Sequence, residues 1–404
     1  MEKIHMKIAH DGGNGYMKDA INGKRVIFPS VLSRILPGNE PSKVDLSDMD
    51  NVKRLLDNCL DYMDIDISSN SIKENGRYFV GNLAANSGAP LIGFNVNSNE
   101  GKANSDVSLI CLLALISYCA LKQYFRSQNQ IPKEIDVSVD ALVTALPIDE
   151  IKIPGVRDKF AQRFLANKHK ITIKSFSQDI DCYIEFKKVD VQPEGVIGQY
   201  GLIGNTDKET SYRKDNIYES FKKKYNYKNF DGETVLKIGN VLSIDIGDGT
   251  VDFSVLNGAS PVPHLNSSIL LGVGNVTEDA VQALHQRYPM YGQLNRQAFM
   301  KIAERGKDSE SSAFRELLRE QLISLESRIE EKVKEIYARV NNQINLIVIC
   351  GGGADILHTT YGKQFEQTIN SMSPFGSAPI LWVPKEYDQM LNLDGLQFRL
   401  NQMR

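Results

Sequence analysis

The sequence has few residues of the kinds that link a chain covalently or hold it in a membrane. It contains only five cysteines in 404 residues, an odd number without the paired spacing of a metal site, which argues against a complete disulfide framework. The longest apolar run, residues 109–121, is interrupted by Ser117 and is shorter than the roughly 20 residues of a membrane-spanning helix. The first residues lack the basic and apolar segments of a secretory signal. We therefore expect a reducing, cytoplasmic location and no direct membrane partner.

The sequence also lacks an excess of charge of either sign. The formal net charge is −3, with 24% charged and 42% hydrophobic residues, which is an ordinary globular balance. Binding of nucleic acid over the whole surface is not favoured, because the phosphate backbone requires a concentrated basic surface. A chain of 404 residues is too long for one compact core and suggests two domains of ordinary size.

What the sequence does have is an unusual glycine-rich turn, Asp-Gly-Gly-Asn-Gly at residues 11–15, directly after an apolar strand. Glycines allow backbone N–H groups to approach phosphate oxygens closely. No helix follows, because residues 16–21 lead into Asn22-Gly23, the preferred pair of a type I′ hairpin turn, and then into a further strand. The loop therefore joins two strands. This arrangement excludes the Walker P-loop and the Rossmann fingerprint, both of which need a helix N-terminus at the phosphate.

The same pattern occurs a second time at residues 245–258. Asp245, Gly247 and Gly249 repeat the Asp-x-Gly-x-Gly spacing of the first loop, again after a strand-like run and again followed by a strand and an Asn-Gly turn at 257–258. An aspartate followed by glycines is usually only a turn. The duplication, however, predicts two related domains with matching loops.

Two such loops facing each other would close on one polyphosphate, each with backbone donors and one carboxylate. Asp11 and Asp245 would then lie near a divalent cation, and Mg²⁺ is suited to this position because it keeps several waters and takes few protein ligands. Lys18, three residues past the first loop, could reach a β- or γ-phosphate. The alternatives are that both aspartates only begin turns and that Lys18 is a solvated strand lysine.

A third glycine cluster lies near the C-terminal end. Apolar residues recur at steps of three and four from Leu318 to Val340, which predicts a long amphipathic helix, and a buried-looking strand at 344–350 runs into Gly351, Gly352 and Gly353. Glycines at the carboxyl end of a strand allow a flat ligand to lie against the backbone, which predicts an adenosine site. The alternative is a simple break between strand and helix.

In this order of loops, the sequence resembles the actin, sugar-kinase and heat-shock ATPase superfamily over nearly its whole length. Within that superfamily it most resembles bacterial actin-like proteins of the ParM/StbA plasmid-segregation type. The segments that carry this likeness are INGKRVIFPS (21–30), RYFVGNLA (77–84), TALPIDE (144–150), QPEG (192–195) and LGVGNVTEDA (271–280).

The resemblance implies an α/β actin-like ATPase fold, with two duplicated ribonuclease H-like domains around a nucleotide cleft. The expected limits are 1–148 for the first domain, 149–384 for the second, and 385–404 for a return to the first. The implied cofactors are ATP and Mg²⁺, with GTP as the open alternative nucleotide.

The resemblance also assigns roles to particular residues. Glu150 would orient the attacking water, with Asp149 beside it as the alternative, and Asp11 and Asp245 would be both catalytic and metal-binding. A helix-terminal acid is the non-catalytic interpretation of Glu150. The residues expected to bind the nucleotide are Gly12, Gly13, Asn14, Gly15, Lys18, Gly247, Asp248, Gly249, Thr250, Gly272, Gly274, Gly351, Gly352 and Gly353. Thr277 is expected to cap a helix, and His10 to be structural.

The implied function is a filament that hydrolyses ATP after assembly and moves plasmid DNA through a DNA-binding adaptor of the ParR type on a centromere-like site. A small-molecule or sugar kinase, a chaperone-like ATPase and a non-hydrolysing scaffold of the pilus-assembly type are the alternatives. Residues 200–240, which include FKKKYNYKNF, are longer than the corresponding link in typical relatives. Lys222 to Lys224 could contact DNA or an adaptor, or form a solvated face.

Overall fold

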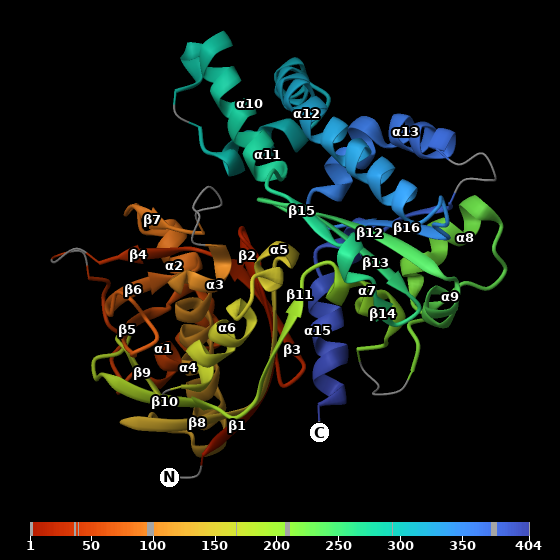
Figure 1. The fold of residues 1–404 in the computed structure, drawn as a ribbon. Coiled ribbons are helices and arrows are strands. Elements are labelled where there is room, and N and C mark those ends of the chain that lie inside the picture. Colours follow the sequence, from red (N-terminus) through yellow and green to blue (C-terminus); the bar gives the residue numbers. More distant parts are fainter. Residues whose placement is uncertain are drawn as a thin grey trace. The chain divides into compact units, whose positions relative to one another are not determined.

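A computed structural model describes residues 3–35, 38, 40–94, 101–166, 168–206, 211–292, 294–372 and 378–403. The chain packs into two compact units, Met1–Pro193 with Leu396–Arg404, and Glu194–Gly395 (Figure 1). The domain limits expected from the duplication, at residues 148 and 384, stay a prediction, because the units are defined by packing and not by internal repetition.

Unit 1, the first of these, is built on an 11-stranded sheet with the order β3-β2-β1-β8-β10-β9-β5-β6-β4-β7, in which β11 also pairs with β8. Its strands are β1 (Ile4–Gly12), β2 (Tyr16–Ile21), β3 (Lys24–Pro29), β4 (Leu32–Arg34), β5 (Asp64–Ser68), β6 (Gly76–Val80), β7 (Leu91–Ile92), β8 (Glu134–Leu146), β9 (His169–Ile173), β10 (Ile180–Phe186) and β11 (Val189–Pro193). Its helical segments are α1 (Met49–Asp57), η1 (Cys59–Asp61), α2 (Asn82–Asn86), α3 (Gly101–Asn104), α4 (Asp106–Gln128), α5 (Ile148–Lys152) and α6 (Val156–Leu165).

The hairpins predicted at the start of the chain are confirmed. β1 pairs antiparallel with β2, and β2 with β3. Asn22 and Gly23 turn the chain between Ile21 and Lys24 with φ of 48° and 80°, the left-handed values that a type I′ turn requires at both positions. The first glycine-rich loop therefore connects strands, as the sequence indicated.

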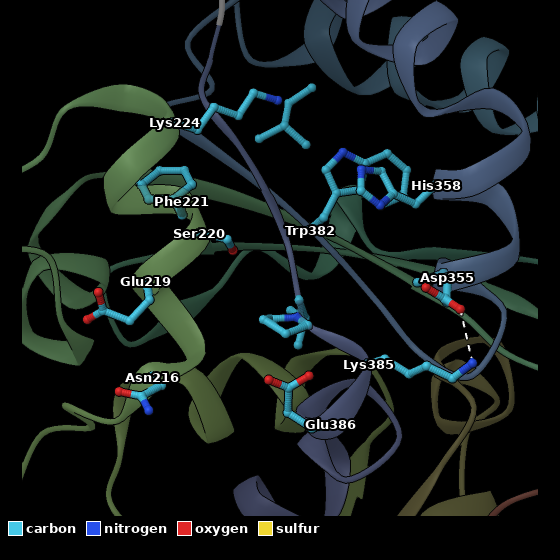
Figure 2. A pocket seen from close by; sticks show the side chains of 14 residues that line it. Asn216, Glu219, Ser220, Phe221, Lys224, Asp355, His358, Trp382, Lys385 and Glu386 are labelled. Atoms are coloured by element: carbon cyan, nitrogen blue, oxygen red, sulfur yellow. Dashed lines mark hydrogen bonds and ion pairs between the residues drawn. The ribbon is translucent and has the colours of Figure 1, made fainter.

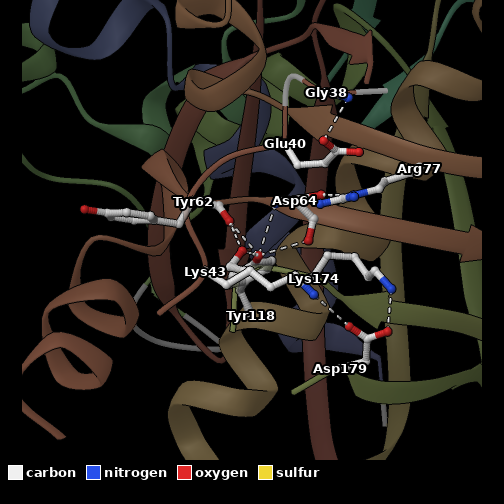
Figure 3. Close-up of polar contacts among 10 residues, drawn as sticks. Gly38, Glu40, Lys43, Tyr62, Asp64, Arg77, Tyr118, Lys174 and Asp179 are labelled. Atoms are coloured by element: carbon white, nitrogen blue, oxygen red, sulfur yellow. Dashed lines mark hydrogen bonds and ion pairs between the residues drawn. The ribbon is translucent and has the colours of Figure 1, made fainter. Parts of the chain in front are cut away.

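Helix α4 forms the core of unit 1. It begins at Ser105, whose side chain accepts a hydrogen bond from Val107 N, and it is long and apolar enough by composition to cross a membrane. Of its most apolar window, 78% is buried inside the protein, which is the pattern of a core helix. Tyr118 on this helix lies beside the backbone of Tyr62 and accepts a hydrogen bond from Asp64 N at 3.1 Å (Figure 3). Burial raises the pKa of the Tyr118 hydroxyl, so this anchor stays neutral.

Unit 2, the second unit, has a smaller sheet with the order β14-β13-β12-β16-β17, in which β15 also pairs with β13. Its elements are α7 (Val196–Ile203), η2 (Asn216–Tyr218), α8 (Glu219–Tyr225), α9 (Gly232–Lys237), β12 (Asn240–Ile246), β13 (Val251–Asn257), β14 (Ser260–Pro261), η3 (Pro263–Leu265), β15 (Ser267–Ile269), α10 (Val273–Arg287), η4 (Pro289–Tyr291), α11 (Arg296–Glu304), α12 (Ser309–Arg339), β16 (Leu346–Cys350), α13 (Ala354–Met372), β17 (Ile380–Trp382) and α14 (Lys385–Asp388). Helix α15 (Leu391–Gln402) begins in unit 2 and ends in unit 1.

The sheet of unit 2 is covered by helices on both faces. Along β16, Ile347 and Ile349 belong to the core shared with α10, α11, α12 and α13, whereas Leu346 and Val348 belong to the core shared with α7, α8 and α9. Because successive strand residues point to opposite faces, an unbroken apolar strand requires such double cover. The result is a three-layer α/β/α arrangement (Figure 1).

The structure refines two predictions for unit 2, the end of the amphipathic helix and the turn of the second hairpin. The amphipathic helix is α12, which ends at Arg339, just before Asn341 and Asn342 take left-handed φ of 52° and 60°. The turn after β13 is made by residues 258 and 259 and not by Asn257-Gly258, because Asn257 still pairs with Ser260. The hairpin is thus one position longer than the sequence pattern suggested.

Candidate functional site

The first glycine loop holds a buried charge pair. Asp11 and Lys18 occupy directly opposite positions on β1 and β2, and Lys18 Nζ lies 3.3 Å from Asp11 Oδ2. Asp11 is only 3% exposed. The fold thus brings together two of the residues predicted to contact phosphate and metal, at the point where the loop begins.

The backbone of this loop is fixed from one side. Ser30 donates its hydroxyl to Gly13 O at 2.6 Å and its N–H to Gly15 O at 3.0 Å. A Cβ on Gly13 would lie 2.7 Å from Tyr16 O, so a side chain is excluded there. Asn14 Oδ1 is buried and has no hydrogen-bond partner among the described residues. An unsatisfied buried acceptor is costly, and a donor on a bound ligand or its water would satisfy it.

Beneath the loop lies a buried polar row that sequence reasoning did not find. His10 Nδ1 lies 2.7 Å from Asp19 Oδ1, and His10 Nε2 lies 2.7 Å from Ser108 Oγ on α4. His10 and Asp19 are fully buried, and a Cβ on Gly12 would lie 2.9 Å from Ser108 Oγ. Desolvation raises the pKa of Asp19, while His10 acts in the opposite direction. His10 is structural, as expected, and it connects the loop to α4.

Glu150 lies in α5, directly after Pro147, and its carboxylate is already engaged. It accepts hydrogen bonds from Lys102 N at 2.8 Å and Ala103 N at 2.9 Å, in the first turn of α3. Gly101 has a φ of +67°, and a Cβ there would lie 2.7 Å from the Glu150 carboxyl. Asp149, the alternative residue, is exposed and lies 3.5 Å from Lys152 Nζ. The catalytic role of Glu150 stays a prediction. In that role the carboxylate would give up its hydrogen bonds to these two amides and accept one from water instead.

The second loop repeats the hairpin with different chemistry. Asp245 is the penultimate residue of β12 and is 9% exposed, and Asp252 occupies the opposite position on β13, where the first hairpin has a lysine. Asn392 Nδ2 donates to Asp245 Oδ2 at 2.9 Å, and Thr250 Oγ1 donates to Asp252 Oδ2 at 3.0 Å. Asn392 was not found from the sequence, because 147 positions separate it from its partner.

The segment at residues 272–274 packs directly on this second loop. Val273 N donates to Gly247 O at 3.0 Å and Gly274 N to Asp248 O at 2.7 Å. A Cβ on Gly272 would lie 2.4 Å from Asp248 O. On the other side, Arg296 Nη1 lies 3.1 Å from Asp248 Oδ2. Both glycines are therefore needed for close packing, and the fold brings together two of the predicted segments.

The third glycine cluster closes the same site. Gly351 has a φ of +92°, and a Cβ there would lie 2.2 Å from Asp245 Oδ1 and 2.6 Å from Ile246 O. Gly353 N donates to Ile246 O at 2.8 Å, and a Cβ on Gly353 would lie 2.4 Å from Val273 Cγ2. Gly352 is exposed, and a Cβ there would meet only the Gln389 side chain, at 3.9 Å. Three predicted segments of unit 2 thus meet at the carboxyl ends of β12 and β16, where ligands bind in open α/β sheets.

The helices that begin at this point favour an anionic ligand. α10 begins at Val273 and α13 at Ala354, one residue after the glycines that pack on the loop. The N-terminus of a helix carries unpaired N–H groups and a partial positive charge, and it is a ready site for phosphate. Thr277 was expected to cap α10, and this is wrong: it lies one turn inside the helix and donates to Val273 O at 2.7 Å. The cap is provided by Gly272, whose N–H donates to Asn275 Oδ1.

The described residues include no group of three or more side chains able to hold a metal ion. Asp11 and Asp245 are single carboxylates, one in each unit. A single carboxylate of this kind fits a hydrated Mg²⁺, which takes one or two carboxylates together with phosphate oxygens, and does not fit a fully protein-ligated metal.

Comparison with known proteins agrees with this arrangement. Residues 9–196 match the family model for the N-terminal domain of actin-like proteins, and residues 243–361 match the model for the C-terminal part of the archaeal MreB-like actin homologue. A search of curated proteins found no significant match to the sequence.

Solved structures match over nearly all of the chain. Actin-like protein Alp7A is 15% identical, with a TM-score of 0.64 over 98% of this chain and 96% of that one. A 15-stranded ParM filament from Clostridium botulinum is 20% identical, with a TM-score of 0.61 over 100% of both chains. Bacillus thuringiensis ParM with AMPPNP is 12% identical, with a TM-score of 0.58 over 98% of both chains. The expected actin-like fold is therefore confirmed, and two family models of actin homologues match separate parts of the chain.

Proposed function

We propose that this actin-like protein binds ATP with Mg²⁺, assembles into filaments and hydrolyses the nucleotide after assembly. The observation that carries the proposal is the convergence of residues 247–250, 272–274 and 351–353 in unit 2, where close packing excludes side chains from most of the glycines. Such a backbone-lined site beside two helix N-termini suits a phosphate ester. A related fold, Bacillus thuringiensis ParM, has been solved with AMPPNP and with ADP.

In the proposed complex the protein acts mainly by positioning and electrostatics, as phosphoryl transfer generally requires. Amides of the second loop and of the first turn of α10 hold phosphate oxygens, and the Gly351–Gly353 backbone supports the adenosine. Lys18 contributes positive charge from the first loop, and Asp11 keeps that ammonium in place through the 3.3 Å contact. Asp11 and Asp245 are the carboxylates that would bind a Mg²⁺ ion, which would neutralise part of the phosphate charge.

Glu150 is proposed to orient the attacking water. The carboxylate now accepts hydrogen bonds from two backbone N–H groups of α3. These bonds hold it in position, and they also occupy the oxygens that would bind water. Assembly would activate hydrolysis if it displaces α3 and frees one carboxylate oxygen. This links the predicted catalytic residue to a short helix that is also anchored by the Arg163 contact with Ala103 O at 2.9 Å.

The proposed partners are further copies of the chain and a DNA-binding adaptor of the ParR type on a centromere-like DNA site. A head-to-tail contact that does not close into a ring produces an open filament. ATP would favour that filament by binding the assembly-competent arrangement more tightly, and hydrolysis removes the preference. The proposed setting is the cytoplasm, and the proposed cargo is plasmid DNA.

Right-angle light scattering on addition of Mg-ATP, with phosphate release followed in the same sample, tests the proposal. We expect a rise above a critical concentration and a decay that follows phosphate release. The same assay with GTP establishes which nucleotide is preferred. A flat trace at high protein concentration would contradict the filament and favour a small-molecule kinase or a non-hydrolysing scaffold.

The Glu150 role needs a variant that keeps the α3 contact. Glu150→Gln retains an amide oxygen that can accept one of the two N–H groups, whereas Glu150→Ala removes both. We expect both variants to bind ATP and to assemble, with phosphate release reduced about 100-fold or more. Glu331→Gln, an exposed carboxylate on α12, is the matched control. Normal phosphate release by Glu150→Gln would remove this residue from the mechanism.

A further inference from the structure

Unit 2 contains a second concave site, outside the glycine cluster. A pocket of about 620 Å³ lies between α8, the first turn of α13 and the connection from β17 to α14 (Figure 2). The residues that the argument uses from its lining are Asn216, Phe221, Lys224, His358, Trp382 and Glu386. This size exceeds that of any single side chain and lies within the range of ligand-binding pockets.

One wall of the pocket is a flat aromatic surface. The rings of Trp382 and His358 stack, with centroids 4.5 Å apart and an interplanar angle of 28°. Trp382 is held in this orientation because its Nε1–H donates to Glu366 Oε1 at 3.1 Å. Figure 2 shows the two rings overlapping above the pocket. A planar group could therefore stack here without reorganising the wall.

The opposite wall is formed by the long segment between α7 and β12. Residues of this segment are not among those predicted to bind the nucleotide. Phe221 on α8 is buried and packs against Tyr225 and Phe230, with ring centroids at 4.9 Å and 4.6 Å. Ile380 N donates to the Tyr225 hydroxyl at 3.0 Å, which fixes α8 to β17. The aromatic residues of FKKKYNYKNF thus hold a preformed wall.

Some of the polar and charged side chains that line the pocket have hydrogen-bond or ion-pair partners, and others do not. Lys385 Nζ lies 3.1 Å from Asp355 Oδ2, and Lys224 forms an ion pair with Glu366. By contrast, the side chains of Glu386, Asn216 and Ser220 have no hydrogen-bond or ion-pair partner in the part of the chain that the structure describes. Both lining lysines are therefore paired, whereas Glu386 presents an unpaired negative charge beside the amide of Asn216 and the hydroxyl of Ser220, which can both donate and accept. Such a lining disfavours phosphate and favours a cation that can donate hydrogen bonds.

We propose that this pocket binds an arginine side chain presented by a protein partner. A guanidinium is planar and always charged, stacks on aromatic faces, and donates in a fork that matches a carboxylate, which is the combination offered by Trp382, His358 and Glu386. A lysine ammonium is a compact, strongly hydrated charge and would leave the flat wall uncovered. The remaining volume accommodates the neighbouring backbone of a peptide.

The sequence provides a direct reporter, because Trp382 is the only tryptophan in the chain. The full-length protein is titrated with acetyl-glycyl-arginyl-glycine amide, and Trp382 emission is followed, with calorimetry in parallel to detect binding that leaves the emission unchanged. The neutral isostere with citrulline and the matched lysyl peptide serve as comparisons. We expect saturable binding of the arginyl peptide, with affinity at least about tenfold above both.

Glu386→Gln keeps the shape of the side chain and removes its charge, and should weaken arginyl binding about tenfold. Glu331→Gln, on the exposed side of α12, should leave it unchanged. The proposal is overturned by equal binding of the arginyl and citrullyl peptides, by no saturable signal in either measurement, by insensitivity to Glu386→Gln, or by tighter binding of adenosine than of the arginyl peptide.

Discussion

The two glycine hairpins have the same backbone and opposite chemistry. At the position directly across from the loop aspartate, the first hairpin has Lys18 and the second has Asp252. The first aspartate is therefore paired with a cation, while the second is held by the amide of Asn392. The two hairpins therefore share a backbone pattern and differ in the side chain opposite the loop aspartate: a cation in the first and an additional carboxylate in the second.

The layers under the two hairpins differ as well. The first has His10 and Asp19 buried together, whereas the corresponding pair in the second is Ile244 and Phe253. A buried polar pair gives a unique arrangement only while each member keeps its partner. The first loop is thus tied to α4 by directional hydrogen bonds, and the second depends on apolar packing and on glycines that allow close approach.

The largest effect is expected where the second hairpin is closed by glycine. Gly351→Ala would place a methyl group 2.6 Å from Ile246 O at a φ of +92°, so we expect a loss of about 3 kcal/mol in unfolding free energy, together with most of the nucleotide affinity. Urea denaturation and ATP titration measure both. Gly352→Ala, where a Cβ makes only an ordinary contact with Gln389, is the control and should change the unfolding free energy by less than about 1 kcal/mol. Equal losses in the two variants would refute the close-packing account.

The buried polar row gives the next effect. His10→Leu leaves Asp19 and Ser108 without their partner, and should cost about 2 kcal/mol of unfolding free energy. A double variant, His10→Ile with Asp19→Leu, imitates the apolar layer of the second hairpin and should cost less than the single change. Denaturant unfolding of the three proteins compares them. A double variant less stable than His10→Leu would contradict this account, because it would show that the stability of the polar row does not depend on the His10–Asp19 pair alone.

The charge difference between the hairpins is tested by ligand affinity. Lys18→Met removes the cation of the first loop and should weaken ATP binding about tenfold or more, with a smaller effect on ADP. Asp252→Asn keeps an oxygen acceptor for one of the hydroxyls of Thr250 and Ser268 and offers an N–H donor to the other, and should change ATP affinity by less than about threefold. Fluorescent-nucleotide competition provides the values. Similar losses in both variants would mean that the two hairpins are electrostatically equivalent.

The smallest effect concerns pH. Asp19 in unit 1 has His10 as its partner, whereas Glu326 on α12 forms no ion pair within the part of the chain that the structure describes, and burial raises its pKa to about 7. Because the folded pKa lies above the unfolded value, the contribution to stability falls as pH rises from about 4.5 to about 7 and then levels off. Glu326→Gln should remove this slope and add about 1 kcal/mol at pH 8, as measured by urea denaturation against Glu331→Gln. An unchanged slope would exclude Glu326 as its source.

Local patterns predicted the hairpins, the long helix and the glycine segments well. Asn22-Gly23 specifies its turn through backbone preference, and the steps of three and four in α12 reflect a single buried face. The Asp-x-Gly-x-Gly repeat indicated the duplication because both copies need the same close approach of backbone. In these cases the physical cause lies within a few residues of the signal.

Contacts between distant segments could not be predicted in this way. Strands β9 and β10 pair within the first sheet, beyond the domain limit expected at residue 148, and a short strand carries no mark of its partner. Glu150 accepts hydrogen bonds from amides 47 and 48 positions away, and Trp382 stacks on His358, which lies 24 positions earlier in the sequence. Such pairings are decided by the packing of whole elements.

The central claim is that the two loop aspartates act on one nucleotide, and a double-mutant cycle tests it most directly. Dissociation constants for Mg-ATP are measured for the parent, Asp11→Asn, Asp245→Asn and the double variant, and again without Mg²⁺. We predict that the losses are non-additive by about 1 kcal/mol or more with Mg²⁺, because both carboxylates would serve the same cation, and that the coupling disappears without it. Additivity within about 0.5 kcal/mol in both conditions would contradict a shared site.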